Sequence, residues 1–333
     1  MAGEQRRACG RLAGRGPAPS RAAAPGPAAH RRSPALTTPG QRAAYLGYRA
    51  GSAVANALPE AVASGLAHAL GAGLSVTMRG RRRMLTRHLR RVYGPDLDGL
   101  ALEAKVQAAF DSYATYWLES FRLATTTPEQ LDAGMSWEGV GHVDDAIAKG
   151  HGVIMALPHL GGWDFGGAWL ACVEGYPATV VVESLEPPEL FEWFADLRRR
   201  MGLTVVPHGP AAGPAILRAL RNNEVVGLVS DRDLGRTGVE VEFFGETTTL
   251  PAGPATLALR TGAVLLTCGM YYTDDGHLGV VRPPIDTSRR GALRDDVARI
   301  TQALAGELEA LIRRAPEQWH LLQPNWPSDF ELQ

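Results

Sequence analysis

The stretch 152–170, GVIMALPHLGGWDFGGAWL, decides the fold class of this chain. Its first part, VIMAL, is an apolar run of strand length that stops at Pro158, and WDFGGAWL then begins a helical pattern. Strands that alternate with helices of ten or more residues predict an α/β fold with a mostly parallel central sheet flanked by helices. Further apolar runs of this kind are ATVVVES (178–184), GLTVVP (202–207), EVVGLVS (224–230), GVEVEFFG (238–245) and AVLLTCGMYY (263–272).

The part of the chain before these strands is predicted to be helical. Apolar residues recur at spacings of three and four from about residue 41, with a break at Pro59, and a long helical stretch ends near residue 126. Residues 1–38 consist of Arg, Ala, Pro and Gly with almost no large apolar side chain, which predicts a disordered tail. We therefore expect one domain over 39–333, with a helical, membrane-facing part (39–135) and an α/β part (136–333).

Composition excludes several classes of protein. The formal net charge of −1 gives no general signature of polyanion binding, and the three cysteines lie far apart without metal-ligand or redox spacing. We expect an intracellular protein with no bound metal and no cofactor. No apolar run reaches the roughly 18 residues of a transmembrane helix, and no secretory signal is recognisable.

His159 and Asp164 are the first candidates for a catalytic site. His159 follows the strand VIMAL at its carboxyl end, the edge at which open α/β sheets bind ligands, and Gly161 and Gly162 allow a tight turn there. Asp164 falls in the first helical turn, from which it is predicted to reach the imidazole and hold one tautomer. A general base needs such a pair, although a capped helix start with no catalytic role has the same pattern.

Three ordered blocks resemble the bacterial lipid A acyltransferase family over residues 40–333. The pattern H-x-x-x-x-D is the first, and SDRDLGRTGVEVEFFGETTTLPAGPATLALRTGA (230–263) is similar to the second. APEQWHLLQPNWPSD (315–329) is similar to the actinobacterial branch, the phosphatidylinositol mannoside acyltransferases. The sequence has no G-x-S-x-G motif, which favours direct transfer over an acyl-enzyme.

The resemblance implies a glycerolipid acyltransferase-like fold and a specific reaction. A fatty acyl chain, expected to be palmitoyl, would move from acyl-CoA as co-substrate to the 6-hydroxyl of the 2-linked mannose of a phosphatidylinositol mono- or dimannoside. His159 would be the general base, a role that typically contributes about 10²–10⁴-fold. Family members pair this histidine with a second acid from the later block. Here Asp233 is the first choice, Glu240 the second, and Asp231 remains open.

Other charged side chains suit a sugar and phosphate headgroup, because carboxylates accept hydrogen bonds from sugar hydroxyls and guanidinium groups bind phosphate in two places. An internal ion-pair cluster is the alternative for each of them. Arg260 is a candidate for the CoA phosphates, with a purely structural helix as the alternative, and Trp319 and Trp326 are expected to cover the core. The predicted substrate-binding residues are Glu183, Arg198, Asp231, Arg232 and Glu240.

A lipid acceptor requires contact with a membrane. RGRRRMLTRHLRR (79–91) contains seven arginines and no acid, which suits the anionic cytoplasmic face of the plasma membrane as a peripheral binding site. A solvated helix face is the alternative, and no nucleic-acid-binding module is recognisable. The competing functions are acylation of another glycolipid or glycerolipid and non-catalytic binding of acyl-CoA or lipid. A dinucleotide-binding enzyme is disfavoured because the G-x-G-x-x-G spacing is missing.

Overall fold

The computed structural model describes residues 38–330, apart from the side chains of residues 60, 61, 63 and 64. The prediction of a disordered tail falls on residues that lie, except for Thr38, outside the described part. From Pro39 onward the chain forms one compact unit. None of the described helices is long and apolar enough to cross a membrane.

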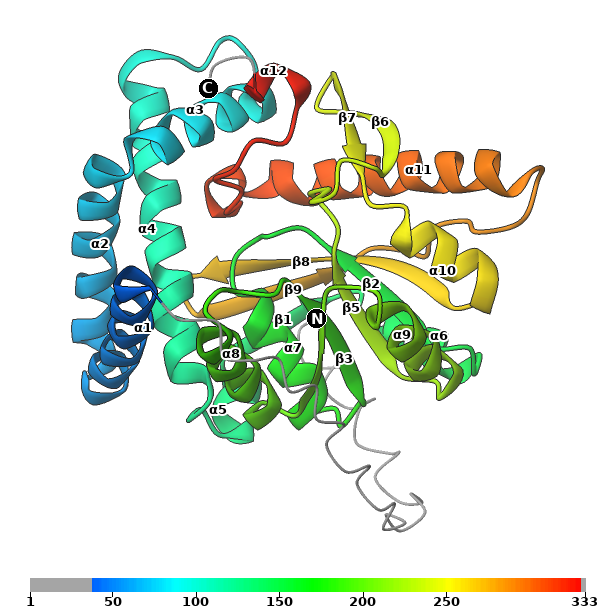
Figure 1. Ribbon diagram of the computed structural model, residues 1–333, viewed down its shortest axis with the longest axis horizontal. Coiled ribbons are helices and arrows are strands. Elements are labelled where there is room, and N and C mark those ends of the chain that lie inside the picture. The colour runs from blue at the N-terminus through cyan, green and yellow to red at the C-terminus, as the bar shows by residue number, and fades with distance from the viewer. Residues whose placement is uncertain (1–37, 331–333) are drawn as a thin grey trace, which may run out of the picture. The chain divides into compact units, whose positions relative to one another are not determined.

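Five helices precede or border the sheet, as the sequence pattern predicts for this part of the chain. Helices α1, α2 and α3 each pack against α4, the long helix drawn in cyan in Figure 1. Pro59 stands just before α2, where it separates α1 from α2. The five helices are α1 (Pro39–Ala57), α2 (Glu60–Thr77), α3 (Arg79–Tyr93), α4 (Gly99–Leu123) and α5 (Pro128–Ala133).

A seven-stranded sheet with the order β1-β9-β8-β2-β5-β3-β4 forms the centre of the unit. β2, β3, β4, β5 and β8 are parallel, whereas β9 runs antiparallel to β8 and β1 lies parallel to β9. The predicted α/β class with a mostly parallel sheet is confirmed. The strands are β1 (Met135–Glu138), β2 (Val153–Leu157), β3 (Ala178–Val182), β4 (Leu203–Pro207), β5 (Val225–Val229), β8 (Val264–Thr273) and β9 (Gly276–Val281).

The central strand β2 is buried on both faces, which explains why its sequence is apolar throughout rather than alternating. Ile154 and Ala156 belong to the core beneath α9, α10 and α11, and Val153 and Met155 belong to the core beneath α6 and α7. The remaining helices are α6 (Gly141–Ala148), α7 (Trp163–Cys172), α8 (Pro188–Arg200), α9 (Ala212–Arg221), α10 (Gly253–Thr261), α11 (Leu293–Arg314), the 3₁₀ helix η3 (Pro316–Gln318) and α12 (Pro327–Phe330).

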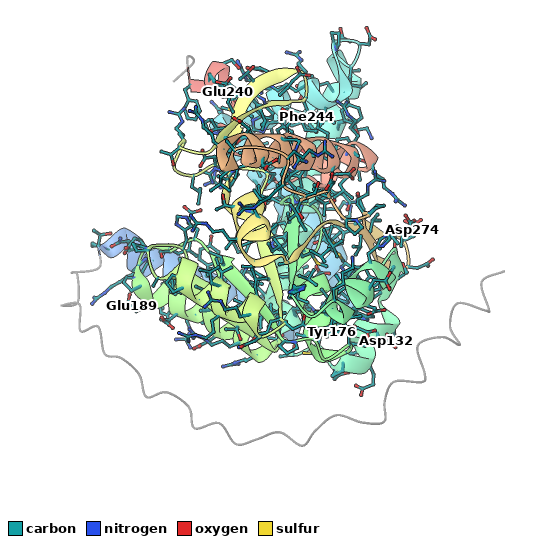
Figure 2. The ribbon with its side chains drawn as sticks, turned by 90° about the vertical axis from the view of Figure 1, so that its right-hand side faces the viewer. Asp132, Tyr176, Glu189, Glu240, Phe244 and Asp274 are labelled. Atoms are coloured by element: carbon teal, nitrogen blue, oxygen red, sulfur yellow. The ribbon has the colours of Figure 1, made fainter. Side chains whose placement is uncertain are left out.

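One predicted strand lies outside the main sheet. β6 (Val239–Phe243) pairs only with β7 (Glu246–Leu250), in an antiparallel hairpin that packs on α11. Its sequence VEVEF alternates, with Val241 and Phe243 buried and Glu240 exposed, as a strand with one solvated face requires. Figure 2 shows Glu240 and Phe244 together at this hairpin.

Candidate active site

His159 and Asp231 meet at the carboxyl edge of the sheet because their strands are neighbours in register. Leu157 of β2 is opposite Val229 of β5, and each candidate residue lies two positions beyond its strand partner. The amide of Ser230 donates to the carbonyl of Leu157 at 2.8 Å, so the alignment continues past the strand ends. Parallel strands ending side by side thus bring together two residues that are 72 positions apart.

The Asp231 carboxylate holds His159 in one tautomer. Nδ1 of His159 lies 2.7 Å from Oδ1 of Asp231, and the amide of His159 donates to Oδ2 at 3.0 Å. A carboxylate only accepts hydrogen bonds, so Nδ1 carries the proton and Nε2 keeps a lone pair. Asp231 is fully buried, whereas one third of the His159 side chain is exposed. The imidazole is therefore fixed on one side and accessible on the other.

The environment of Asp231 favours its charged form. Burial by itself raises the pKa of this carboxyl, but the charge of His159 and hydrogen bonds from His159 and Trp319 hold the pKa below its ordinary value. Trp319 donates from Nε1 to Oδ2 at 2.7 Å. The pair thus combines an ionised buried acid with an accessible imidazole, which is the arrangement of a general base.

The second acid is Asp231, and the first choice, Asp233, is wrong as the partner of His159. Asp233 accepts hydrogen bonds from the amides of Gly235 and Gly238 and from the hydroxyl of Thr249, so it organises the turn that precedes β6. Glu240, the second choice, is exposed on the β6 hairpin (Figure 2).

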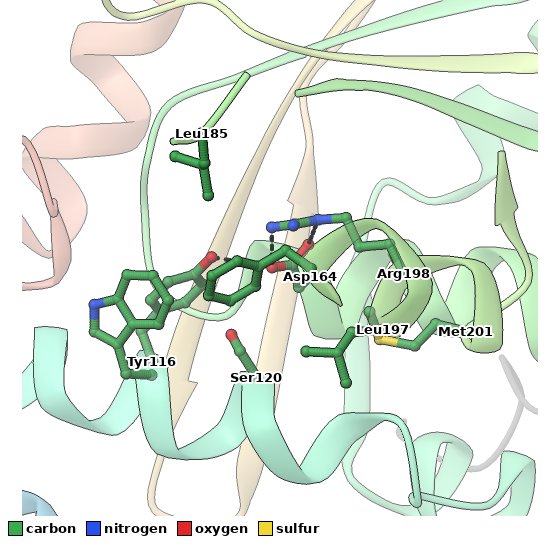
Figure 3. A pocket seen from close by; sticks show the side chains of 9 residues that line it. Tyr116, Ser120, Asp164, Leu185, Leu197, Arg198 and Met201 are labelled. Atoms are coloured by element: carbon green, nitrogen blue, oxygen red, sulfur yellow. Dashed lines mark hydrogen bonds and ion pairs between the residues drawn. The ribbon is translucent and has the colours of Figure 1, made fainter. Parts of the chain in front are cut away.

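Asp164 does not reach back to the imidazole, contrary to the prediction. Arg198 donates two hydrogen bonds to the Asp164 carboxylate, from Nε at 3.0 Å and from Nη2 at 2.8 Å. The hydroxyl of Tyr116 donates to the same carboxylate at 3.0 Å. Figure 3 shows this cluster, with the guanidinium of Arg198 facing Asp164. Arg198 therefore forms an internal ion pair, which was the alternative to its predicted role in binding the substrate phosphate.

A cavity of about 80 Å³ lies against this cluster. Its polar wall consists of Tyr116, Ser120, Asp164 and Arg198 (Figure 3). Trp163 connects the cavity to the dyad, because it stacks on Tyr116 at 4.0 Å between ring centroids and meets His159 edge-on at 5.5 Å. The apolar part of the lining comes from Trp117, Leu185, Phe194, Leu197 and Met201.

The two glycines after His159 serve packing within the protein. Gly161 has a φ of +56°, and a Cβ there would lie 2.3 Å from the carbonyl oxygen of Met270 on β8. A Cβ on Gly162 would lie 2.7 Å from a carboxylate oxygen of Glu119 and 3.0 Å from the imidazole of His277. Gly161 thus lets the turn lie close to the backbone of β8, and the lack of a side chain at Gly162 leaves room for Glu119 of α4.

Glu183 and Arg232, two further predicted substrate-binding residues, are at least partly exposed to solvent. Glu183 is exposed just after β3, and Arg232 is half-buried next to Asp231. Arg260 stands in the last turn of α10, shortly before Val264, which pairs with the first residue of β2. It therefore lies at the amino edge of the sheet, opposite to the edge that carries His159.

The basic segment 79–91 corresponds to α3, and it is only partly a free cationic surface. Arg82 pairs with Glu103, and Arg87 and Arg91 pair with the buried Asp329. The exposed arginines of the segment that form no ion pair with the described residues are Arg79, Arg81, Arg83 and Arg90.

Sequence reasoning missed the contribution of the C-terminal segment 316–326 to this site. Trp319 and Trp326 are fully buried, as expected, but Trp319 also donates to Asp231. The side chain of Asn325 donates to the carbonyl of Asp231 at 3.0 Å, and the amide of His320 donates to the carbonyl of His159 at 2.7 Å. The sequence signals this segment through its resemblance to the family block and its aromatic residues, but neither signal indicates that it contacts Asp231.

Comparison with known proteins shows the family of this chain. The sequence model of the bacterial lipid A biosynthesis acyltransferases matches residues 30–328. The chain belongs to this family. It is therefore an O-acyltransferase, and the expected family resemblance is confirmed.

Several curated relatives are similar to this acyltransferase over most of their length. The phosphatidylinositol mannoside acyltransferase of Mycolicibacterium smegmatis is 39% identical over 86% of this chain and 92% of its own. The protein of the same name from Mycobacterium tuberculosis is 43% identical over 67% of this chain and 70% of its own. A lipid A biosynthesis acyltransferase of Haemophilus influenzae is 25% identical over 59% of this chain and 60% of its own.

Proposed function

We propose that this acyltransferase moves a fatty acyl chain from acyl-CoA to a mannose hydroxyl of a phosphatidylinositol mannoside. The observation that carries the proposal is the His159–Asp231 pair, in which Nδ1 is held by a buried carboxylate. No described residue forms a hydrogen bond with Nε2 of His159. The names of the relatives that are 39% and 43% identical supply the acceptor class.

In the proposed reaction, Nε2 of His159 removes the proton of the acceptor hydroxyl while its oxygen attacks the thioester carbonyl. Asp231 stabilises the imidazolium that forms. The tetrahedral intermediate then collapses, the carbon–sulfur bond breaks, and the imidazolium protonates the leaving CoA thiolate. The atoms balance as one ester formed and one thioester consumed, with the imidazole returned to its neutral form. We expect the acyl group to be palmitoyl. We expect it to be attached to the 6-hydroxyl of the 2-linked mannose.

We further propose that the protein binds peripherally to the anionic cytoplasmic face of the plasma membrane through α1, α2 and α3. Large apolar side chains are exposed on α1 and α2, and unpaired arginines are exposed on α3. An apolar surface beside cations suits the interface of an anionic bilayer. The exposed apolar residues are Leu46 and Val54 on α1 and Val62, Leu70 and Val76 on α2.

The test combines purified protein with palmitoyl-CoA and vesicles that contain phosphatidylinositol mono- or dimannoside, and a parallel reaction contains lysophosphatidate. Thiol release and the acylated lipid are measured, and NMR of the product locates the ester. His159→Ala is expected to abolish turnover. His151→Ala, an exposed histidine just before the opposite end of β2, is the matched control and should act like the native protein.

Each outcome separates the competing functions. Acylated mannoside from the native protein and the control alone supports the proposal. Acylated lysophosphatidate alone would retain the mechanism and refute the acceptor. Binding of palmitoyl-CoA without turnover would indicate a non-catalytic binder, and equal turnover by His159→Ala would refute the proposed base.

A further inference from the structure

Trp319 is the third member of the hydrogen-bonded group around Asp231, and it comes from the far end of the sequence. Its indole N–H reaches Oδ2 of Asp231 at 2.7 Å, and both side chains are fully buried. Oδ2 also accepts the amide of His159 at 3.0 Å. Two N–H donors thus fix this oxygen, and the geometry leaves Oδ1 facing the imidazole at 2.7 Å.

The backbone around Trp319 is tied to the turn that carries His159. Trp319 forms a β-bridge with Leu160, the amide of Gly161 donates to the carbonyl of Gln318 at 2.9 Å, and the amide of His320 donates to the carbonyl of His159 at 2.7 Å. The indole therefore cannot shift without the turn. Its position relative to the dyad is set by main-chain contacts, which is what a positioning group requires.

An N–H donor in a buried site also changes the basicity of the carboxylate that it contacts. The hydrogen bond from Trp319 stabilises the ionised form of Asp231 and so lowers the basicity of this carboxylate. A less basic carboxylate attracts the imidazolium of His159 less strongly. Without the indole donor, the Asp231–imidazolium pair would be more stable, and the base would lose its proton only at higher pH. Trp319 thus affects both where Asp231 points and how strongly it holds the imidazolium.

We propose that Trp319 is a positioning residue for acyl transfer, which acts through Asp231 by fixing the carboxylate and moderating its basicity. The inference rests on the proposed role of His159 as the base. Trp319 touches neither substrate nor reacting atoms in this scheme, so it is not a catalytic residue.

Three other charged or titratable side chains lie near the dyad. His320 follows Trp319, and burial followed by the charge of His159 lowers the pKa of His320 to about 3, so this side chain is neutral at neutral pH. Asp164, on α7, is neutralised by Arg198. Arg232 follows Asp231 directly and is half-buried.

The chain offers a matched control in Trp326. It lies in the same segment, is also fully buried, and donates from Nε1 to a neutral acceptor, the carbonyl of Phe243, at 3.1 Å. Replacing either tryptophan removes a buried indole of the same size and one hydrogen bond. Only Trp319 contacts the dyad, so the two replacements differ in the feature under test.

The experiment compares kcat/KM as a function of pH for the native protein, Trp319→Phe and Trp326→Phe, with palmitoyl-CoA and the mannoside in vesicles. Because phenylalanine leaves a cavity, β-(3-benzothienyl)alanine is also incorporated at 319 and, separately, at 326. This analogue keeps the shape of the indole and replaces the N–H by sulfur. Circular dichroism and urea unfolding establish that each variant is folded.

With the analogue at 319, we expect kcat to fall by about tenfold with KM for palmitoyl-CoA unchanged, as for one lost hydrogen bond to a charged group. We also expect the acid limb of the profile to move to higher pH by about half a unit or more. The analogue at 326 should leave the limb in place. A limb that stays at the native pH, or moves to lower pH, with the analogue at 319 overturns the inference.

His159→Ala keeps the two proposals distinguishable. If it is inactive while the analogue at 319 acts like the native protein, the base stands and the role of Trp319 is refuted. If His159→Ala remains active, the proposed function itself fails, whatever the profile of the Trp319 variants.

Discussion

His159 and Asp231 occupy equivalent positions two residues beyond the ends of adjacent parallel strands, and their side chains meet at 2.7 Å. The dyad therefore depends on the register of β2 with β5 rather than on local sequence. Any change that shifts this register would separate the side chains of His159 and Asp231, although both residues would still be present in the sequence.

Asp231→Asn is expected to lower kcat by roughly 10²–10⁴-fold, because the amide cannot stabilise the imidazolium and no longer selects one tautomer. Asp233→Asn is the control, since the hydrogen bonds of Asp233 go to the turn before β6 and to Thr249 on β7 rather than to His159. Its kcat should stay near the native value. The measurement is turnover of palmitoyl-CoA at saturating acceptor, and similar losses in both variants would argue against Asp231 as the acid of the pair.

Asp164→Asn is expected to destabilise the fold, because it leaves the guanidinium of Arg198 buried without its counter-charge. Breaking a buried ion pair on one side typically costs about 3–5 kcal/mol. The double variant Asp164→Asn with Arg198→Met should recover part of this loss. Urea unfolding of the two single variants and the double variant measures the coupling, and additive losses would show that the pair is not coupled.

The buried imidazole of His320 should make the stability of the fold sensitive to acid. Its folded-state pKa of about 3 is below the ordinary value of about 6.5, because burial and then the charge of His159 disfavour the protonated form. Between these values the unfolded chain binds the proton and the folded chain does not. The stability from this group is therefore present above about pH 6.5 and is lost as pH falls toward 3.

His320→Gln should remove that dependence, which amounts to about 1.4 kcal/mol per pH unit. Glutamine remains neutral and can keep a hydrogen bond with Ser112, the present partner of Nε2. Unfolding free energies at pH 7 and pH 5 measure the effect, with the exposed His208→Gln as the control. Equal slopes in the native protein and His320→Gln would contradict the assigned protonation state.

The exposed apolar residues of α1 and α2 should govern membrane binding. The double variant Leu46→Asp with Val76→Asp is expected to bind anionic vesicles at least about tenfold more weakly, because it removes two large apolar groups from the interface. Leu293→Asp changes an exposed leucine at the start of α11 and should bind as the native protein does. Vesicle sedimentation at low and high salt is the measurement, and equal weakening by both variants would place the binding surface elsewhere.

Much of the fold was predictable because its signals are local. The break at Pro59, the helices before residue 124 and five strands of the main sheet follow from apolar spacing and turn residues. β1 and β9 were missed because they are short, and β9 begins GHLG, with few residues that favour strands. β6 was assigned to the wrong sheet because its alternating pattern was treated as an apolar run.

The site was predictable only in part because its geometry depends on strand order. The sequence indicates that His159 and Asp231 both end strands at the carboxyl edge, but it does not reveal that these strands are neighbours. Asp164 lies close to His159 in sequence, yet the first turn of α7 directs it to Arg198 on α8. That contact depends on helix packing, which no local pattern records.

The placement of Trp319 also bears on how the enzyme is made. Asp231 leaves the ribosome 88 residues before Trp319, a delay of about 4–18 s at 5–20 residues per second. During that time β2 and β5 can pair, but Trp319, whose indole donates a hydrogen bond to Asp231, has not yet been synthesised. We therefore expect a nascent chain to have reduced activity until Trp319 has been synthesised and its indole contacts Asp231. The hydrogen-bonded group around Asp231 is thus complete only after segment 316–326 has been synthesised.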